Sequence, residues 1–178
     1  MIILKTPPEI RDIHKNIILC CYIMYMNIIS FMNVIDTTIR YQSTEPLSNL
    51  QAEKLHQGLD ARIFIYNHDG HTVTEIRRDK QFATTMGTVK NDLGMHMNYT
   101  AAKYHEPVAQ HNILTVKDCI RTIFHSLPFI MTPKLMVSKL TTIATNRLNW
   151  FSVNVIISHY YISNIIIHWI LLDYENHY

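Results

Sequence analysis

The feature that most constrains the fold is a dense apolar run at residues 16–26, which reads NIILCCYIMYM. A strand with one face in water alternates apolar and polar side chains, and this run does not alternate in that way. It therefore predicts a central strand that is buried on both faces. A chain of 178 residues, of which 48% are hydrophobic and 17% charged, is long enough to bury such a strand in one domain.

Strands and helices follow this run in an order typical of a mixed α/β layer fold. Alternating patterns and turn residues predict further strands at residues 27–34, 37–43, 72–77 and 95–99. Apolar residues at helical spacing predict helices at residues 47–66, 84–93, 107–127 and 132–151. The Glu45-Pro46 pair is expected to break the strand pattern. The chain is thus divided into a polar lead (1–15), a core (16–151) and an apolar extension that packs on the core (152–178).

Residues 107–127 form the clearest amphipathic helix in the sequence. Pro107 suits a first helical turn, and apolar residues then recur at steps of three and four. At about 100° per residue, Gln110, Lys117 and Arg121 share a stripe beside that apolar face. Together with Lys134 on the following helix, these cations are either a solvated helical face or contacts for nucleic-acid phosphates.

Several common kinds of site are missing from the sequence. The 11 histidines show no zinc-ligand spacing, and there is no Gly-rich phosphate loop, nucleophile elbow or visible Ser/His/Asp arrangement. Three cysteines make no disulfide framework, which favours a reducing, intracellular location in the cytoplasm or nucleus. A net charge of +2 does not by itself indicate a nucleic-acid partner.

One acidic residue occupies a position where ligand sites often form. Asp79 follows a predicted strand and precedes a predicted helix. It is either a turn or capping residue, or a ligand for a divalent cation that needs further acidic groups nearby. The acidic residues that could join it, none at diagnostic spacing, are Asp36, Glu75, Glu106 and Asp118.

Residues 154–172 are the segment of the sequence that could form a membrane-spanning helix. The segment is about long enough for a spanning helix. It also contains His159, Ser163, Asn164 and His168, so a buried strand and helix is the simpler interpretation. A membrane partner is therefore not the favoured prediction.

Five segments, taken in order, resemble the integrase core of Copia-type LTR-retrotransposon polyproteins, a retroviral-integrase-like family. HKNIILCCYIMYMNIISFMNVIDTTIRYQSTE is similar to the first three strands of that core, and YNHDGHTVTEIRRDKQF to the strand before its second catalytic Asp. YHEPVAQHNILTVKDCIRTIFHSLPF resembles the helix that carries the catalytic Glu. PKLMVSKLTTIATNRLNWF resembles the next helix, and LLDYENHY a downstream Asp-Tyr segment.

The resemblance implies an RNase H-like fold with a mixed five-stranded sheet flanked by helices. It implies an enzyme that joins element DNA to target DNA and works as a multimer, so a homo-oligomer and a DNA partner are expected. Three carboxylates of the family hold two Mg²⁺ ions. One ion activates the attacking hydroxyl or water, and the other stabilises the leaving oxygen.

Two of the three carboxylate positions are substituted in this chain. The first Asp of the family falls on Tyr22, the second on Asp79 and the Glu on Gln110. A phenol and an amide are neutral at pH 7 and cannot replace two negative charges. The resemblance therefore predicts a degenerate, inactive copy with weak residual nucleic-acid binding, for which the candidate residues are Lys117, Arg121 and Lys134.

Two other interpretations stay open at this point. The chain could be an active Mg²⁺-dependent nuclease or integrase that uses Asp79 with a substitute acid, either Glu106 or Asp118. It could also be a non-enzymatic interaction protein or a membrane-associated protein that uses residues 154–172. Metal binding that depends on Asp79 would support the active enzyme. Partition of the protein into detergent would support the non-enzymatic or membrane-associated protein.

Overall fold

The protein is described here by a computed structural model that covers residues 12–78, 82, 96–99, 107–128, 131–151 and 162–168. Its strands form one sheet in the order β3-β2-β1-β4-β5. The strands are β1 (Asn16–Met26), β2 (Ile29–Asp36), β3 (Gln42–Leu47), β4 (Thr72–Arg78) and β5 (His96–Tyr99). The helices are α2 (Ala52–His68), α4 (Pro107–Ser126), α5 (Lys134–Leu148) and α6 (Ser163–His168). β1 pairs antiparallel with β2 and parallel with β4, which confirms the mixed α/β layer fold.

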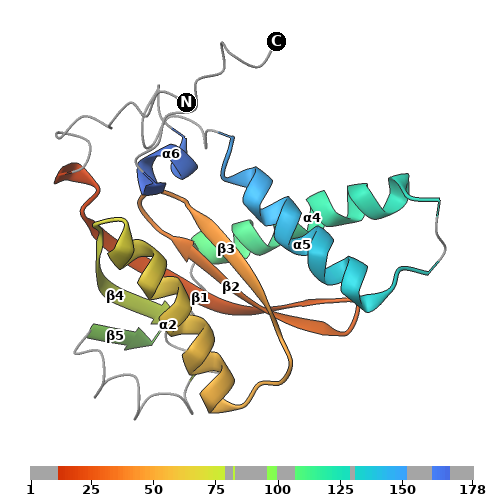
Figure 1. Cartoon of the computed structure of the whole chain (residues 1–178), viewed down its shortest axis with the longest axis horizontal. Helices are drawn as coiled ribbons and strands as arrows, with labels where there is room; N and C mark the ends of the chain where they lie inside the picture. The colour runs from red at the N-terminus through yellow and green to blue at the C-terminus, as the bar shows by residue number, and fades with distance from the viewer. Residues whose placement is uncertain are drawn as a thin grey trace.

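β1 lies in the middle of the sheet and is buried on both faces, as its apolar run predicts. Leu19 and Cys21 point into a core that α2 and α6 cover. Cys20, Tyr22 and Met24 point to the opposite face, which α4 and α5 cover (Figure 1). Because successive side chains of a strand alternate between its faces, helices on both sides leave no exposed position from Ile17 to Met24.

The second and third strands begin and end later than predicted. Asn27 and Ile28 form the turn after β1, with φ angles of 43° and 64°, so β2 starts at Ile29. The prediction of a strand at 37–43 is wrong, because Asp36 accepts the backbone N–H groups of Thr38 and Ile39 in the turn that ends β2. β3 instead includes Pro46, which is tolerated since β3 is an edge strand and an edge residue can lack an N–H group.

The helices agree more closely with the sequence pattern. α4 spans Pro107–Ser126 against a prediction of 107–127, and α5 spans Lys134–Leu148 within the predicted 132–151. α2 begins at Ala52 rather than at residue 47, because Leu47 belongs to β3. The predicted helix at 84–93 lies outside the described residues.

The end of α5 is fixed to the edge strand by side-chain hydrogen bonds. The Asn149 side chain accepts from the Gln42 N–H at 2.9 Å and donates to the Gln42 carbonyl at 2.8 Å. Thr44 on β3 donates to Thr145 on α5 at 2.7 Å. The two Asn149 bonds pair backbone groups of an edge strand that the sheet itself leaves open. Together with the Thr44–Thr145 bond, they hold α5 against the face where α4 also packs.

Within the described parts of the chain, no helix has both the length and the apolar character needed to cross a membrane. In the segment 154–172, residues 163–168 form the short helix α6. Ile165, Ile166 and Ile167 of this helix are buried, and the last two belong to the core under α2.

Candidate functional site

The two positions that the resemblance gives as substituted, Tyr22 and Gln110, lie on elements that pack together at the first turn of α4. Tyr22, in the middle of β1, is buried in a small cluster with Ala109 of α4. Gln110 is the next residue of α4 and is exposed to solvent. The structure therefore brings a phenol and the start of an amide-bearing helix together on one face of the sheet.

A buried amide pair, which the sequence reasoning missed, lies beside Tyr22. Asn33 of β2 is directly opposite Tyr22 in the antiparallel register and is fully buried. The Asn112 side-chain N–H of α4 donates to the Asn33 side-chain oxygen at 3.0 Å. The only signal in the sequence was an asparagine inside each of two apolar patterns, and such residues are seldom buried without a partner.

The retained acid of the resemblance, Asp79, lies outside the described residues, and so does Glu106. β4 ends at Arg78, the residue before Asp79, and Arg78 pairs with Cys21 in the parallel register. Arg78 is fully buried. The residue directly before Asp79 is therefore a buried arginine.

Asp36 lies on the opposite face of the sheet from Tyr22. It pairs with Leu19, whose side chain points into the core under α2. Its Oδ1 accepts the backbone N–H groups of Thr38 and, at 2.7 Å, of Ile39, so the carboxyl group fixes a turn. Burial raises the pKa of Asp36 to about 6, against the lowering effect of those two hydrogen bonds and of Arg40. Asp36 is thus a structural residue on the wrong face for a site with Tyr22.

The remaining acidic candidates are each paired with a neighbouring arginine. Asp118 forms an exposed ion pair with Arg121, at 2.9 Å and one helical turn away on α4. It is eight residues beyond Gln110, which is about 12 Å along the helix axis. Glu75 pairs with Arg77 on β4 at 2.9 Å. A metal pair about 4 Å across needs its ligands within a few ångströms, so Asp118 does not complete a site at Gln110.

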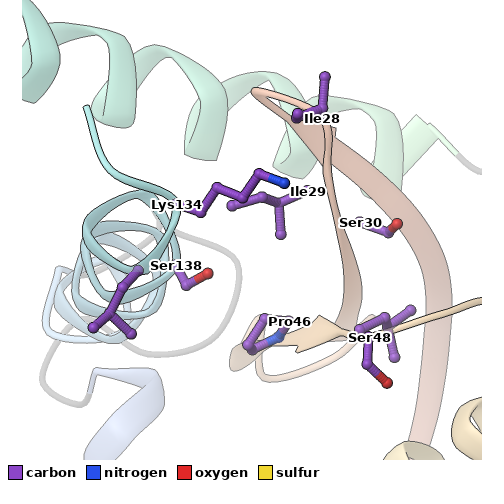
Figure 2. A pocket seen from close by; sticks show the side chains of 9 residues that line it. Ile28, Ile29, Ser30, Pro46, Ser48, Lys134 and Ser138 are labelled. Carbon is purple, nitrogen blue, oxygen red and sulfur yellow. The ribbon is translucent and has the colours of Figure 1, made fainter. Parts of the chain in front are cut away.

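The three cations named from the sequence do not form one patch. Lys117 is half-buried and Arg121 exposed on α4, whereas Lys134 begins α5. Lys134 lines a cavity of about 570 Å³ between the β1–β2 turn, the end of β3 and the start of α5. Figure 2 shows Lys134 beside Ile29, with Ser30 and Pro46 on the far wall. No α4 residue lines this cavity, so Lys134 belongs to a different surface from the other two cations.

The described side chains at this site do not fit a Mg²⁺ pair. Among the described residues, no three His, Cys, Asp or Glu side chains lie close enough together to hold a metal ion. Where α4 packs on β1 and β2, the described polar groups are the Tyr22 phenol and the amides of Asn33 and Asn112, with the exposed Gln110 amide next to them on α4. Mg²⁺ prefers anionic oxygen ligands in octahedral geometry, which neutral phenol and amide groups do not supply.

Comparison with known proteins adds evidence on the fold. No protein-family model and no curated protein matches the sequence. Among solved structures, the chain is similar to the catalytic core domain of BIV integrase, with a TM-score of 0.60 and 14% sequence identity. The match covers 78% of this chain and 86% of the BIV chain. Helices on both faces of a mixed sheet, as in Figure 1, thus give this chain the fold of a retroviral integrase catalytic core.

Proposed function

We propose that the chain is a degenerate integrase core of the Copia type that does not catalyse strand transfer. One observation carries the proposal: Tyr22 packs against the first turn of α4, next to Gln110. These are the two positions where the resemblance expects the first Asp and the Glu. Both are neutral in the pH range of an integrase reaction, since a phenol ionises only near pH 10.

The charge deficit explains why catalysis is lost. Two Mg²⁺ ions carry four positive charges, and three carboxylates offset most of that charge in an active core. This chain retains one of the three, Asp79. A single carboxylate leaves a metal pair strongly undercompensated, so neither the attacking hydroxyl nor the leaving oxygen receives its metal ion.

The alternative of an active enzyme depends on a substitute acid, and the described geometry disfavours two of the candidates. Asp36 faces the α2 side of the sheet, and Asp118 is paired with Arg121. Glu106 is the candidate that the described residues do not address, and it precedes Gln110 by four positions. The alternative is therefore reduced to the pair Asp79 and Glu106.

Weak DNA binding without chemistry is the remaining part of the proposal. Lys117 and Arg121 follow Gln110 along α4 and can contact phosphates, although Asp118 offsets part of the Arg121 charge. Contacts to so few phosphates give low affinity that falls further as salt is added. Binding as a homo-oligomer and an intracellular location belong to the proposal through the same resemblance.

A strand-transfer assay in Mg²⁺ and in Mn²⁺ tests the proposal. The wild-type chain is expected to give no joined product. The double variant Tyr22→Asp with Gln110→Glu restores the carboxylates, and it is expected to bind Mn²⁺ and to melt at a higher temperature when the ion is present. Adding Asp79→Asn to the double variant is the matched control, which is expected to remove both effects.

Two outcomes contradict the proposal in different ways. Robust joining by the wild-type chain shows that the core is active and that another acid completes its site. A double variant that is folded by circular dichroism but binds no Mn²⁺ shows that Tyr22 and Gln110 are not the ligand positions. The circular dichroism check is needed because a carboxylate at the buried Tyr22 position destabilises the fold when no metal is bound.

A further inference from the structure

His71 has two hydrogen-bond acceptors and a proton for only one of them when it is neutral. This buried residue precedes β4, and its Nδ1 lies 2.9 Å from the backbone carbonyl of His14. Its Nε2 lies 3.3 Å from the backbone carbonyl of Ile167 in α6. A carbonyl oxygen only accepts, and a neutral imidazole has one N–H group. Both hydrogen bonds form together only in the imidazolium state.

A second histidine joins α6 to the same part of the core. His168, the last residue of α6, has its Nδ1 2.9 Å from a carboxylate oxygen of Asp69. Its Nε2 lies 3.4 Å from the hydroxyl of Tyr41, which can donate or accept. Protonation of His168 therefore keeps both contacts and turns the one with Asp69 into an ion pair, which is stronger than a neutral hydrogen bond.

α6 depends on these contacts because it is short. A helix of six residues does not persist in water without tertiary packing. Its packing consists of three buried isoleucines and a hydrogen bond of 2.7 Å from the Ser163 hydroxyl to the carbonyl of Ile39. The two histidine contacts lie at the other end of the helix, so they decide whether that end stays docked.

We propose that the two histidines form a proton-controlled clamp on α6, which docks more tightly as the pH falls through the range where imidazoles titrate. In the docked state, a protonated His71 can donate to a second carbonyl, and a protonated His168 can form an ion pair with a carboxylate. Each of these two interactions requires the added proton. Docking thus favours proton uptake, and proton uptake favours docking. Above that pH range, α6 keeps its apolar contacts and loses the second hydrogen bond of His71.

The other titratable groups around the clamp do not cancel this effect. Burial and then the neighbouring His71 lower the pKa of His14, which disfavours the charged form of His14. Burial raises the pKa values of Tyr41 and Tyr66, so both phenols stay neutral while imidazoles titrate. The charged or titratable groups that face the clamp from α2 and the following turn are Arg62, Tyr66, His68 and Asp69.

Hydrogen exchange of the α6 amides tests the clamp in the full chain. Protection factors are measured at pH 5.8 and 7.8, each divided by the exchange of the unfolded chain at the same pH. In the wild type we expect protection to be about tenfold higher at pH 5.8, which is the effect of one charge-assisted hydrogen bond. The double variant His71→Gln with His168→Gln is expected to lose this pH dependence.

The control variant is His56→Gln, which removes a histidine of α2 that pairs with Asp60, within the same helix, at 3.3 Å. It is expected to keep the tenfold response. Equal wild-type protection at the two pH values overturns the clamp, and so does a double variant that keeps the response. If the double variant does not fold, ¹⁵N spectra of the wild-type imidazoles decide, because a His71 ring that carries one proton at pH 5.8 also overturns the clamp.

Discussion

Replacing Asp36 by Asn is predicted to stabilise the protein at neutral pH. Asp36 is fully buried at the end of β2, and its Oδ1 accepts the N–H groups of Thr38 and Ile39. Its Oδ2 has no hydrogen-bond partner among the described residues. Asn keeps an oxygen for the two N–H groups and never ionises. The variant therefore removes a buried charge while it preserves the turn that ends β2.

The size of the effect follows from the pKa of Asp36. Burial raises this pKa from 3.8 to about 6. A difference of about 2.2 pH units corresponds to about 3 kcal/mol, by which the folded state disfavours the ionised group. Between pH 3.8 and 6 the folded protein holds a proton that the unfolded chain has released, so stability falls as the pH rises through this window. Below the window this cost is absent, and above it the cost is complete.

Urea unfolding of wild type and Asp36→Asn at pH 4.5 and 7.5 measures the effect. The stability of the variant relative to wild type is expected to rise by about 2 kcal/mol between the two pH values, because part of the cost is already present at pH 4.5. Asp118→Asn is the control, since it removes an exposed carboxylate and is expected to change stability by less than about 0.5 kcal/mol. A difference that does not depend on pH, or a variant that is less stable at pH 7.5, refutes the reasoning.

Two further predictions concern stability at other positions. Asn112→Ala is expected to cost about 2 kcal/mol in urea unfolding, because it leaves the fully buried amide of Asn33 without its hydrogen bond. Replacing both asparagines by Leu is expected to lower the free energy of unfolding by less than the two single Leu substitutions added together. If the loss in the double variant equals that sum, the two side chains do not interact. Ile28→Gly is expected to raise stability by about 1 kcal/mol, since Ile28 is exposed and has a φ of 64°, which suits glycine. The same substitution at exposed Leu114 in α4 is expected to cost about 1 kcal/mol, and a loss at both positions would contradict the turn argument.

The sequence predicted the elements whose patterns are long and repetitive. The run at Asn16–Met26 gave the central strand with its bounds, and the apolar face of Pro107–Ser126 gave α4 to within one residue. β3 was displaced because a single carboxylate, that of Asp36, turns the chain for five residues before the next strand begins. Two backbone N–H groups that donate to one side chain leave no periodic signal, so pattern reasoning placed a strand where a turn lies.

The polar contacts of the site depend on register, which the sequence does not contain. Tyr22 and Gln110 were named through the resemblance, and the structure places Tyr22 in one cluster with Ala109, the residue before Gln110. The Asn33–Asn112 hydrogen bond joins residues 79 positions apart and requires that Asn33 lie opposite Tyr22. A shift of one residue in the β1–β2 pairing would turn Asn33 to the other face, so the pair could not be found before the register was known.

Under the proposed function, the substitutions at Tyr22 and Gln110 also bear on why the fold survives them. Carboxylates that converge on a metal pair repel one another when no cation is bound, and this repulsion weakens the packing of a metal-free core. In this chain the phenol of Tyr22 lies in a buried cluster with Ala109, and Asn112 binds Asn33 beside it. The contact of α4 with β1 and β2 is thus made of apolar packing and a neutral hydrogen bond, neither of which needs a counter-ion. Under the proposed function, the loss of the ligands removes catalysis and at the same time removes the dependence of this packing on metal.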